Sequence, residues 1–141
     1  MTDRPSGLPE GAEEISVAAF AKYVGPIWRL PHEGKDAPRR FAFHVTEKHM
    51  NAAGSVHGGM LMTLADMAMS QTSRLVSGAQ SCATVSLNCD FVGPGRLGDL
   101  VEARVTVTRK SRTMVFLSAE LVSEDRVLLV ATGLWKIVFE T

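Results

Sequence analysis

With 141 residues, the chain is long enough to form one domain whose core needs neither disulfides nor metal. Fifteen Lys and Arg residues balance fifteen Asp and Glu residues, so no overall field favours a nucleic acid or an anionic membrane as partner. The sequence also has no run near the ~18 apolar residues of a membrane span. Because the net charge is zero, any site that binds an anion must arise from a local group of residues.

The first part of the chain predicts a leader, a short helix and a strand. Residues 1–13 are rich in Pro, Gly and charge, so we expect a flexible leader there and the folded domain over residues 14–141. The segment EEISVAAFAKYV has apolar residues near helical spacing, and Gly25 with Pro26 is expected to end that helix. The segment RRFAFHVTE alternates with a period of two, which predicts a strand with Phe41, Phe43 and Val45 on one face.

The only long helix is predicted after a loop at residues 51–57. From Gly58 onward the apolar residues follow the three-and-four spacing of one helix face, and Gly78 is expected to close the helix. The expected face consists of Leu61, Leu64, Ala65, Ala68, Thr72 and Leu75.

Four strands are predicted next, in the segments TVSLNCDFV, VEARVTVTR, TMVFLSAELV and RVLLVATGLWKIVF. In the first of them, alternation places Thr84 on the polar face and Cys89 on the apolar face. The short connections predict antiparallel neighbours, and Gly133 predicts a bulge or bend in the last strand. A long helix packed on a curved antiparallel sheet buries all these apolar faces, so the predicted fold class is α+β.

The two cysteines, Cys82 and Cys89, lie seven residues apart in one expected strand. An extended strand of that length spans about 23 Å, which is far beyond the reach of a disulfide. We therefore expect two free thiols. Because the N-terminus also lacks the apolar core of a signal peptide, a reducing, cytoplasmic location is expected.

Asp66 stands in the middle of the long apolar helix and is the first candidate functional residue. A buried carboxylate costs several kcal/mol unless another group pairs with it or the protein uses it. A solvated surface carboxylate is the ordinary alternative. However, the positions three and four residues away hold no cation that would neutralise it, and this favours a general base. Those positions are Met62, Thr63, Met69 and Ser70.

Two glycines, Gly58 and Gly59, open the same helix, although each costs about 1 kcal/mol of helix propensity. The unpaired N–H groups of a first turn suit an oxyanion or a polarised carbonyl, whereas a tight turn is the alternative reason for the glycines. Gly58 and Asp66 are eight residues apart, which means about 12 Å of rise and different directions on the helix. If both serve one substrate, a second copy of the chain must supply one of them, which predicts a homodimer with composite sites.

The pattern N-x2-G-x2-H-G-G-x6-D resembles the signature of hotdog-fold thioesterases of the phenylacetate-pathway type. The segment FVGPGRLGD also resembles the end of a strand and the turn in that family, and the resemblance covers the chain after about residue 14. It implies a long helix wrapped by an antiparallel sheet, an acyl-CoA substrate, no cofactor, and dimers that often pair into tetramers. The pattern is carried by Asn51, Gly54, His57, Gly58, Gly59 and Asp66.

The resemblance also implies a role for each matching residue. The Gly58 N–H and the Asn51 amide would polarise the thioester carbonyl, and Asp66 of the other subunit would act as general base or as nucleophile. Thr84 would help to position the attacking water. His57 would order the loop or contact the thioester, and a purely structural hydrogen bond is its alternative role.

Further residues are expected to contact the substrate. Flexible methionines adapt to varied acyl chains, although methionines on a helix are more often core residues. A cationic turn between two strands fits the phosphates of coenzyme A, although charged turns are also ordinary solvated surface. The candidates for substrate binding are Gly59, Met62, Met69, Arg109, Lys110 and Arg112.

The preferred function is hydrolysis of an acyl-CoA or aryl-acyl-CoA thioester, and two alternatives stay open. One is a non-catalytic module that binds or senses acyl-CoA, which the presence of Asp66 disfavours. The other is an acyl-CoA hydratase or dehydratase, although the HFPG and NPxH loops of those enzymes do not occur in the sequence. No metal is expected, since the histidines lack ligand spacing. The acyl group, and acyl carrier protein as an alternative donor, stay open.

Overall fold

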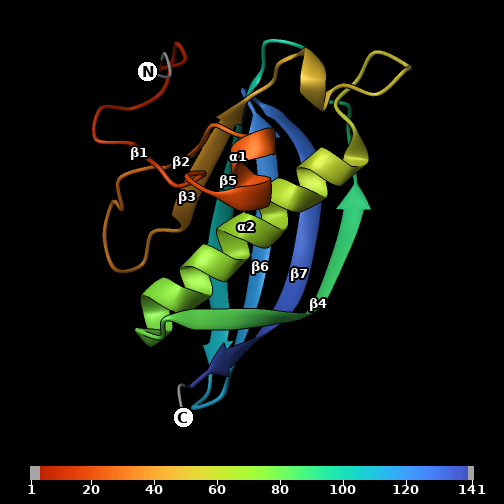
Figure 1. Cartoon of the computed structure of the whole chain (residues 1–141). Helices are drawn as coiled ribbons and strands as arrows, with labels where there is room; N and C mark the ends of the chain where they lie inside the picture. Colours follow the sequence, from red (N-terminus) through yellow and green to blue (C-terminus); the bar gives the residue numbers. More distant parts are fainter. Residues whose placement is uncertain (1–3, 140–141) are drawn as a thin grey trace.

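The fold consists of a seven-stranded antiparallel sheet curved around one long helix, α2, as the sequence pattern predicts (Figure 1). The structure is a computed structural model that describes residues 4–139. Its elements are, in chain order, β1 Glu13–Glu14, α1 Ala19–Val24, β2 Ile27–Arg29, β3 Arg39–His44, the short 3-10 helix η1 Glu47–His49, α2 Gly58–Ser77, β4 Ser81–Phe91, β5 Leu100–Lys110, β6 Met114–Ser123 and β7 Arg126–Val138.

The strand order is β1-β2-β3-β5-β6-β7-β4, which leaves β4 at an edge of the sheet. Antiparallel neighbours were predicted for all four later strands, and this is confirmed for β5–β6 and β6–β7. It is wrong for β4 and β5, because the connection between them crosses the end of the sheet instead of turning back. The N–H of Val92 donates to the carbonyl of Leu128 (2.9 Å), and the N–H of Val45 donates to the carbonyl of Asp99 (2.8 Å). These bonds fix the crossing.

Helix α2 begins and ends as predicted. Gly78 takes the left-handed conformation (φ 71°) that glycine adopts without strain, and its N–H donates to the carbonyl of Arg74 (2.9 Å). Leu75 is the exception on the predicted face, because it is 38% exposed. The buried residues of the predicted face, which pack against the concave side of the sheet, are Leu61, Leu64, Ala65, Ala68 and Thr72.

The helix predicted for EEISVAAFAKYV is largely wrong, because only its second half, α1, is helical. The first half pairs with β2 instead. The N–H of Ile15 donates to the carbonyl of Ile27 (2.8 Å), and the N–H of Ile27 donates to the Ser16 hydroxyl (2.8 Å). These bonds satisfy backbone groups that a helix would otherwise use. The predicted end of the helix at Gly25 is confirmed.

Residues 1–3 of the predicted leader lie outside the described residues. The following part lies against the sheet, where Ala12 belongs to a small second core cluster and Leu8 packs against that cluster. The Arg4 guanidinium lies 5.3 Å from the centre of the Trp28 ring, within cation–π range. Part of the predicted leader therefore contacts the folded domain.

A bulge or bend was predicted at Gly133, and the bulge is wrong. The register of β7 runs without interruption through Gly133, which faces Leu87 of β4 and Leu117 of β6. A Cβ at this position would overlap the indole ring of Trp135. Glycine is therefore required because the fully buried Trp135 ring folds over the backbone there.

Candidate active site

Asp66 and Thr84 form the first cluster of the candidate site. The Thr84 hydroxyl on β4 donates to the Asp66 carboxylate on α2, with an Oγ1–Oδ1 distance of 2.8 Å. Asp66 is partly buried, and none of the ion pairs formed by residues 4–139 includes it. The carboxylate is thus held by a neutral hydroxyl donor and not by a cation, which suits a general base.

A β-bulge brings Thr84 to Asp66. Thr84 pairs with Trp135 and Ser86 pairs with Leu134, so Val85 is an extra residue in β4. Simple alternation predicted that Thr84 and Cys89 lie on opposite faces of the strand. This prediction is wrong, because the bulge places both on the same face. One inserted residue reverses the alternation of side chains. Before the bulge the even-numbered Thr84 therefore faces α2, whereas after it the odd-numbered Leu87 and Cys89 face the core.

The first turn of α2 forms the second cluster. The Gly59 N–H donates to Nδ1 of His57 (2.9 Å), and the Met60 N–H donates to the His57 carbonyl (2.9 Å). His57 is therefore the N-cap of α2. The N–H of Gly58 has no hydrogen-bond partner among residues 4–139. It is a free donor at the positive end of the helix, as a site for a polarised carbonyl requires.

Phe91, at the end of β4, covers Gly58. A Cβ on Gly58 would lie 3.0 Å from Cε1 of the Phe91 ring, which is closer than ordinary contact. The ring is nevertheless 54% exposed. Sequence reasoning did not nominate Phe91, because its approach to Gly58 depends on the path of the edge strand.

Asn51 closes the loop before α2. Its Oδ1 accepts hydrogen bonds from the N–H groups of Ala53 (2.9 Å) and Ser55 (3.0 Å), and its Nδ2 donates to the Ser55 hydroxyl (3.0 Å). These bonds hold the loop in one conformation. Within one chain, the Asn51 amide serves the loop that carries Gly58, and it does not contact Asp66.

The remaining predicted residues take no part in the hydrogen bonds of the two clusters, although Met62 lies one helical turn from both Gly58 and Asp66. Met69 is fully buried in the core, whereas Met62 is exposed on the surface of α2. In Figure 1 the turn between β5 and β6 lies at the lower end of the sheet, whereas α2 begins near the upper end. That turn carries the exposed Arg109, Lys110 and Arg112.

Two titratable groups near the site, Cys89 and His49, were not predicted as site residues. Burial raises the pKa of the Cys89 thiol, and the carboxylates of Asp90 and Asp66 raise it further. Cys89 therefore remains a neutral thiol in the neighbourhood of Asp66. Burial also lowers the pKa of His49, partly offset by its bond to the Val24 carbonyl. Both cysteines are free, as predicted.

In residues 4–139, no three His, Cys, Asp or Glu side chains gather closely enough to hold a metal ion. None of the helices in the same range is long and apolar enough to cross a membrane.

Comparison with known proteins defines the class of protein. A family model described as the thioesterase superfamily matches residues 53–130. The chain is 36% identical over 132 residues to PA0474 of Pseudomonas aeruginosa, which is named as a candidate esterase, covering 91% of this chain and 96% of that protein. It is 32% identical over 93 residues to human acyl-coenzyme A thioesterase 13, covering 63% of this chain and 64% of that protein.

Solved structures agree with the fold. The TT0310 protein of Thermus thermophilus matches with a TM-score of 0.73 and 28% identity, over 84% of this chain and 97% of that one. Zebrafish thioesterase superfamily member 2 matches with a TM-score of 0.76 over 86% of this chain and 88% of that one, and its 20% identity supports the fold alone. The fold is thus the hotdog fold of thioester-hydrolysing enzymes, as predicted. The chain belongs to the thioesterase superfamily.

Proposed function

We propose that the protein is an acyl-CoA thioesterase, which converts an acyl-CoA or aryl-acyl-CoA and water into the free acid and coenzyme A. The observation that carries the proposal is the 2.8 Å hydrogen bond from Thr84 to Asp66, a carboxylate with no cationic partner in residues 4–139. The similarity to human acyl-coenzyme A thioesterase 13 supports coenzyme A as the carrier.

In the proposed mechanism, Asp66 accepts a proton from a water molecule as that water attacks the thioester carbonyl. The Thr84 hydroxyl orients the carboxylate. Negative charge develops on the carbonyl oxygen, where the free Gly58 N–H donates a hydrogen bond. The carbon–sulfur bond then breaks, and the coenzyme A sulfur takes up the proton. Direct attack by Asp66 would instead form a mixed anhydride, which water hydrolyses.

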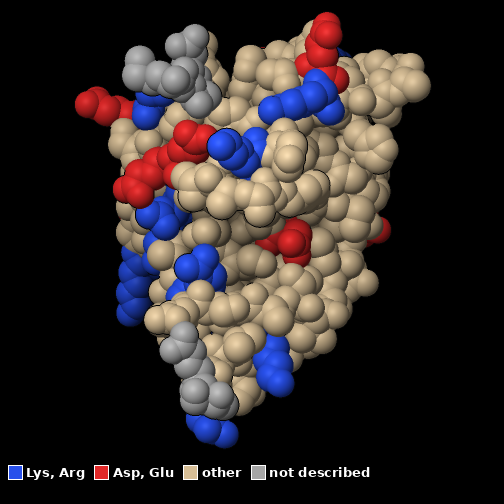
Figure 2. Space-filling view, viewed as in Figure 1, with Lys and Arg blue, Asp and Glu red and all other residues tan. Residues whose placement is uncertain are grey.

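The proposal requires two copies of the chain, because Gly58 and Asp66 are eight residues apart on one helix. Strand β4 is the proposed contact. It is eleven residues long and pairs only with β7, so one edge of its backbone has no neighbour within the described chain. Three large apolar side chains on or beside it are exposed, Val85 (55%), Phe91 (54%) and Val92 (58%). Figure 2 shows that the side of this face that carries β4 is largely uncharged.

Two copies that pair through β4 across a twofold axis would form one continuous sheet and two equivalent sites. Each site would combine Asp66 and Thr84 of one copy with Gly58, Gly59, His57 and the Asn51 loop of the other. A dimer of dimers extends the proposal, with the cationic β5–β6 turn binding the phosphates of coenzyme A. The two free cysteines are consistent with a cytoplasmic location.

Release of free coenzyme A from a panel of acyl-CoA thioesters tests the proposed activity. Wild type is expected to hydrolyse several of them, and Asp66→Asn is expected to lose at least about 100-fold in kcat, which corresponds to about 2.7 kcal/mol. Light scattering should give at least twice the mass of one chain. An active monomer would contradict the composite site, and a wild type that binds but does not hydrolyse would contradict the enzyme.

Base and nucleophile are separated by a single turnover in water enriched in oxygen-18. A general base leaves the label in the product acid alone, whereas attack by Asp66 followed by hydrolysis of the anhydride at the Asp66 carboxyl carbon leaves the label in Asp66 and an unlabelled Asp66 oxygen in the product acid. Mass spectrometry of the peptide that contains Asp66 reads out the difference.

A further inference from the structure

A groove of about 370 Å³ lies between α1 and the beginning of α2. Its volume is within the range of roughly 300–1,000 Å³ that small-molecule sites occupy. In Figure 1, α1 lies in front of α2 near the upper half of that helix. Residues that line the groove include Phe20, Tyr23, Val24, His57, Met60 and Thr63.

The groove begins at the proposed carbonyl site. His57 and Gly59, which both line it, are the chain neighbours of Gly58, whose N–H is free. A thioester carbonyl bound at Gly58 would therefore place one of its two substituents next to the mouth of the groove. The other substituent is the coenzyme A sulfur, which leads to the phosphates.

The walls of the groove suit an apolar group. Phe20 is 62% exposed and Tyr23 is 80% exposed, and α1 has no buried residue. Aromatic side chains left in water at such exposure are typical of a surface that binds another apolar group. Met60 adds a flexible apolar side chain from α2.

Hydrogen bonds hold the base of the groove in place, and His49, which lies there, is uncharged. The Thr46 N–H donates to Nδ1 of His49 (3.0 Å), so Nε2 carries the proton and donates to the Val24 carbonyl (2.6 Å). Lys48 Nζ donates to the Gly25 carbonyl (2.6 Å). The bonds to the Val24 and Gly25 carbonyls anchor the C-terminal end of α1. Lys48, the charged side chain in the lining of the groove, is used in one of them.

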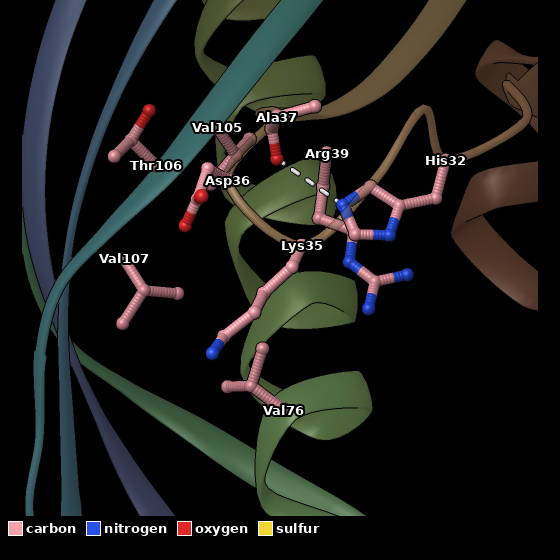
Figure 3. A pocket seen from close by; sticks show the side chains of 9 residues that line it. All are labelled: His32, Lys35, Asp36, Ala37, Arg39, Val76, Val105, Thr106 and Val107. Atoms are coloured by element: carbon pink, nitrogen blue, oxygen red, sulfur yellow. Dashed lines mark hydrogen bonds between the residues drawn. The ribbon is translucent and has the colours of Figure 1, made fainter.

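A second cavity provides a contrast (Figure 3). It lies beside Val76, eighteen residues along α2 from Gly58, a distance of about 27 Å along the axis. Its walls carry Lys35, Asp36 and Arg39, and such a charged lining does not suit an apolar acyl chain. The groove at α1 is therefore the better site for the acyl group.

We propose that the groove between α1 and α2 binds the acyl group of the thioester, with Phe20 and Tyr23 as specificity-determining residues. The inference rests on the proposed function and deepens it. The preferred substrates are thioesters of apolar acids, either medium-length aliphatic chains or aryl-acyl groups, and acetyl-CoA is a poor substrate because it leaves the groove empty.

Two measurements test the inference. In the first, kcat/KM is measured for acetyl-, hexanoyl-, octanoyl- and phenylacetyl-CoA. Phe20→Ala and Tyr23→Ala are expected to lower kcat/KM at least tenfold for octanoyl- and phenylacetyl-CoA, and less than twofold for acetyl-CoA. Thr63→Phe fills the groove from α2 while the sequence of α1 stays unchanged, and it is expected to give the same pattern. Phe116→Ala, which removes an exposed aromatic ring from β6, is the matched control and should leave the profile unchanged.

The second measurement does not depend on hydrolysis. Calorimetry gives the Kd of S-octyl-CoA and S-ethyl-CoA, two thioethers that cannot be hydrolysed. If Phe20→Ala weakens S-octyl-CoA binding at least fivefold and leaves S-ethyl-CoA unchanged, the groove binds the chain, whether or not wild type is a hydrolase. If the variants weaken both thioethers equally, or neither, the inference is overturned. An inactive wild type with selective octyl binding would overturn the proposed function alone.

Discussion

The two clusters of the candidate site are held in place by different means. Gly58 is positioned by its own stretch of chain, through the His57 cap and the Asn51 loop, all within eight residues. Asp66, by contrast, accepts a hydrogen bond from Thr84, which is eighteen residues away and reaches it only because β4 carries a bulge. One half of the site is therefore local, and the other half depends on strand register.

This difference gives the two halves different weaknesses. Thr84 can be moved or removed by changes in β4 that leave α2 intact. The Gly58 donor belongs to the backbone, so a substitution cannot delete it and can only displace it. Mutations in the two halves should consequently differ in how much they lower kcat and in which second change restores activity.

Deletion of Val85 is expected to have the largest effect. Removing the extra residue restores simple alternation and turns Thr84 away from Asp66 or turns Leu87 and Cys89 away from the core. We expect a loss of kcat of more than about 100-fold, the size of a lost catalytic group. Val85→Ala keeps the residue count and is expected to stay within about threefold of wild type. A folded deletion variant, verified by circular dichroism, with normal activity would contradict the role of the bulge.

Thr84→Val should have the next largest effect. It removes the hydroxyl that donates to Asp66 and keeps the shape of the side chain. A hydrogen bond to a charged group is worth about 1.5–3 kcal/mol, so kcat is expected to fall about 10- to 100-fold. Thr84→Ser retains the hydroxyl and should recover most of the activity. Equal activities of the two variants in the coenzyme A assay would rule out a role for the hydroxyl.

Gly58→Ala tests the local half. The new methyl group would meet the Phe91 ring at 3.0 Å and push the first turn of α2 or the ring aside. A displacement of this kind is expected to lower kcat about tenfold, about 1.4 kcal/mol. Adding Phe91→Ala removes the contact, so the double variant should be more active than Gly58→Ala alone. If the second change brings no recovery, the loss does not arise from contact with Phe91.

Asn51→Ala should act mainly on stability. It removes three hydrogen bonds within the loop, and the free energy of unfolding is expected to fall by about 1–3 kcal/mol. Urea denaturation measures this change. Asn51→Asp keeps both acceptor bonds from Ala53 and Ser55, so it should be the milder variant. A wild-type midpoint for Asn51→Ala would show that the loop does not depend on this side chain.

The smallest effect, a change in the pH dependence of Tm, is expected for Asp99→Asn in the connection between β4 and β5. Burial acts to raise the pKa of Asp99, but hydrogen bonds from Arg126 (2.7 Å) and the Arg96 N–H (2.9 Å) outweigh it and lower the pKa. A lowered pKa in the folded state stabilises the protein above the unfolded value of about 4, and this contribution is lost as pH falls through the folded pKa. The decrease in Tm between pH 7 and pH 3 should be smaller in Asp99→Asn than in wild type.

Much of the fold could be predicted because its signals are local or periodic. The limits of α2, the strand β3 and the hairpins of β5 to β7 follow from side-chain alternation, helical spacing and Gly78. The beginning of α1 could not be predicted, since Ile15 and Ser16 bond to Ile27, which lies on a strand with a weak sequence signal. The place of β4 at the edge was also missed, because a short connection does not specify whether the chain turns back or crosses over.

The sequence by itself determined the candidate residues and the local half of the site: Asp66 without a cation nearby, the Gly58 turn and the hotdog-type pattern. Capping and periodicity act over a few residues, so the order of amino acids is sufficient to reveal them. Only the tertiary structure decided that Thr84 faces Asp66, that Phe91 covers Gly58 and that α1 forms a groove with α2. Those contacts depend on register, a bulge and the packing of distant segments, which are properties of the folded sheet.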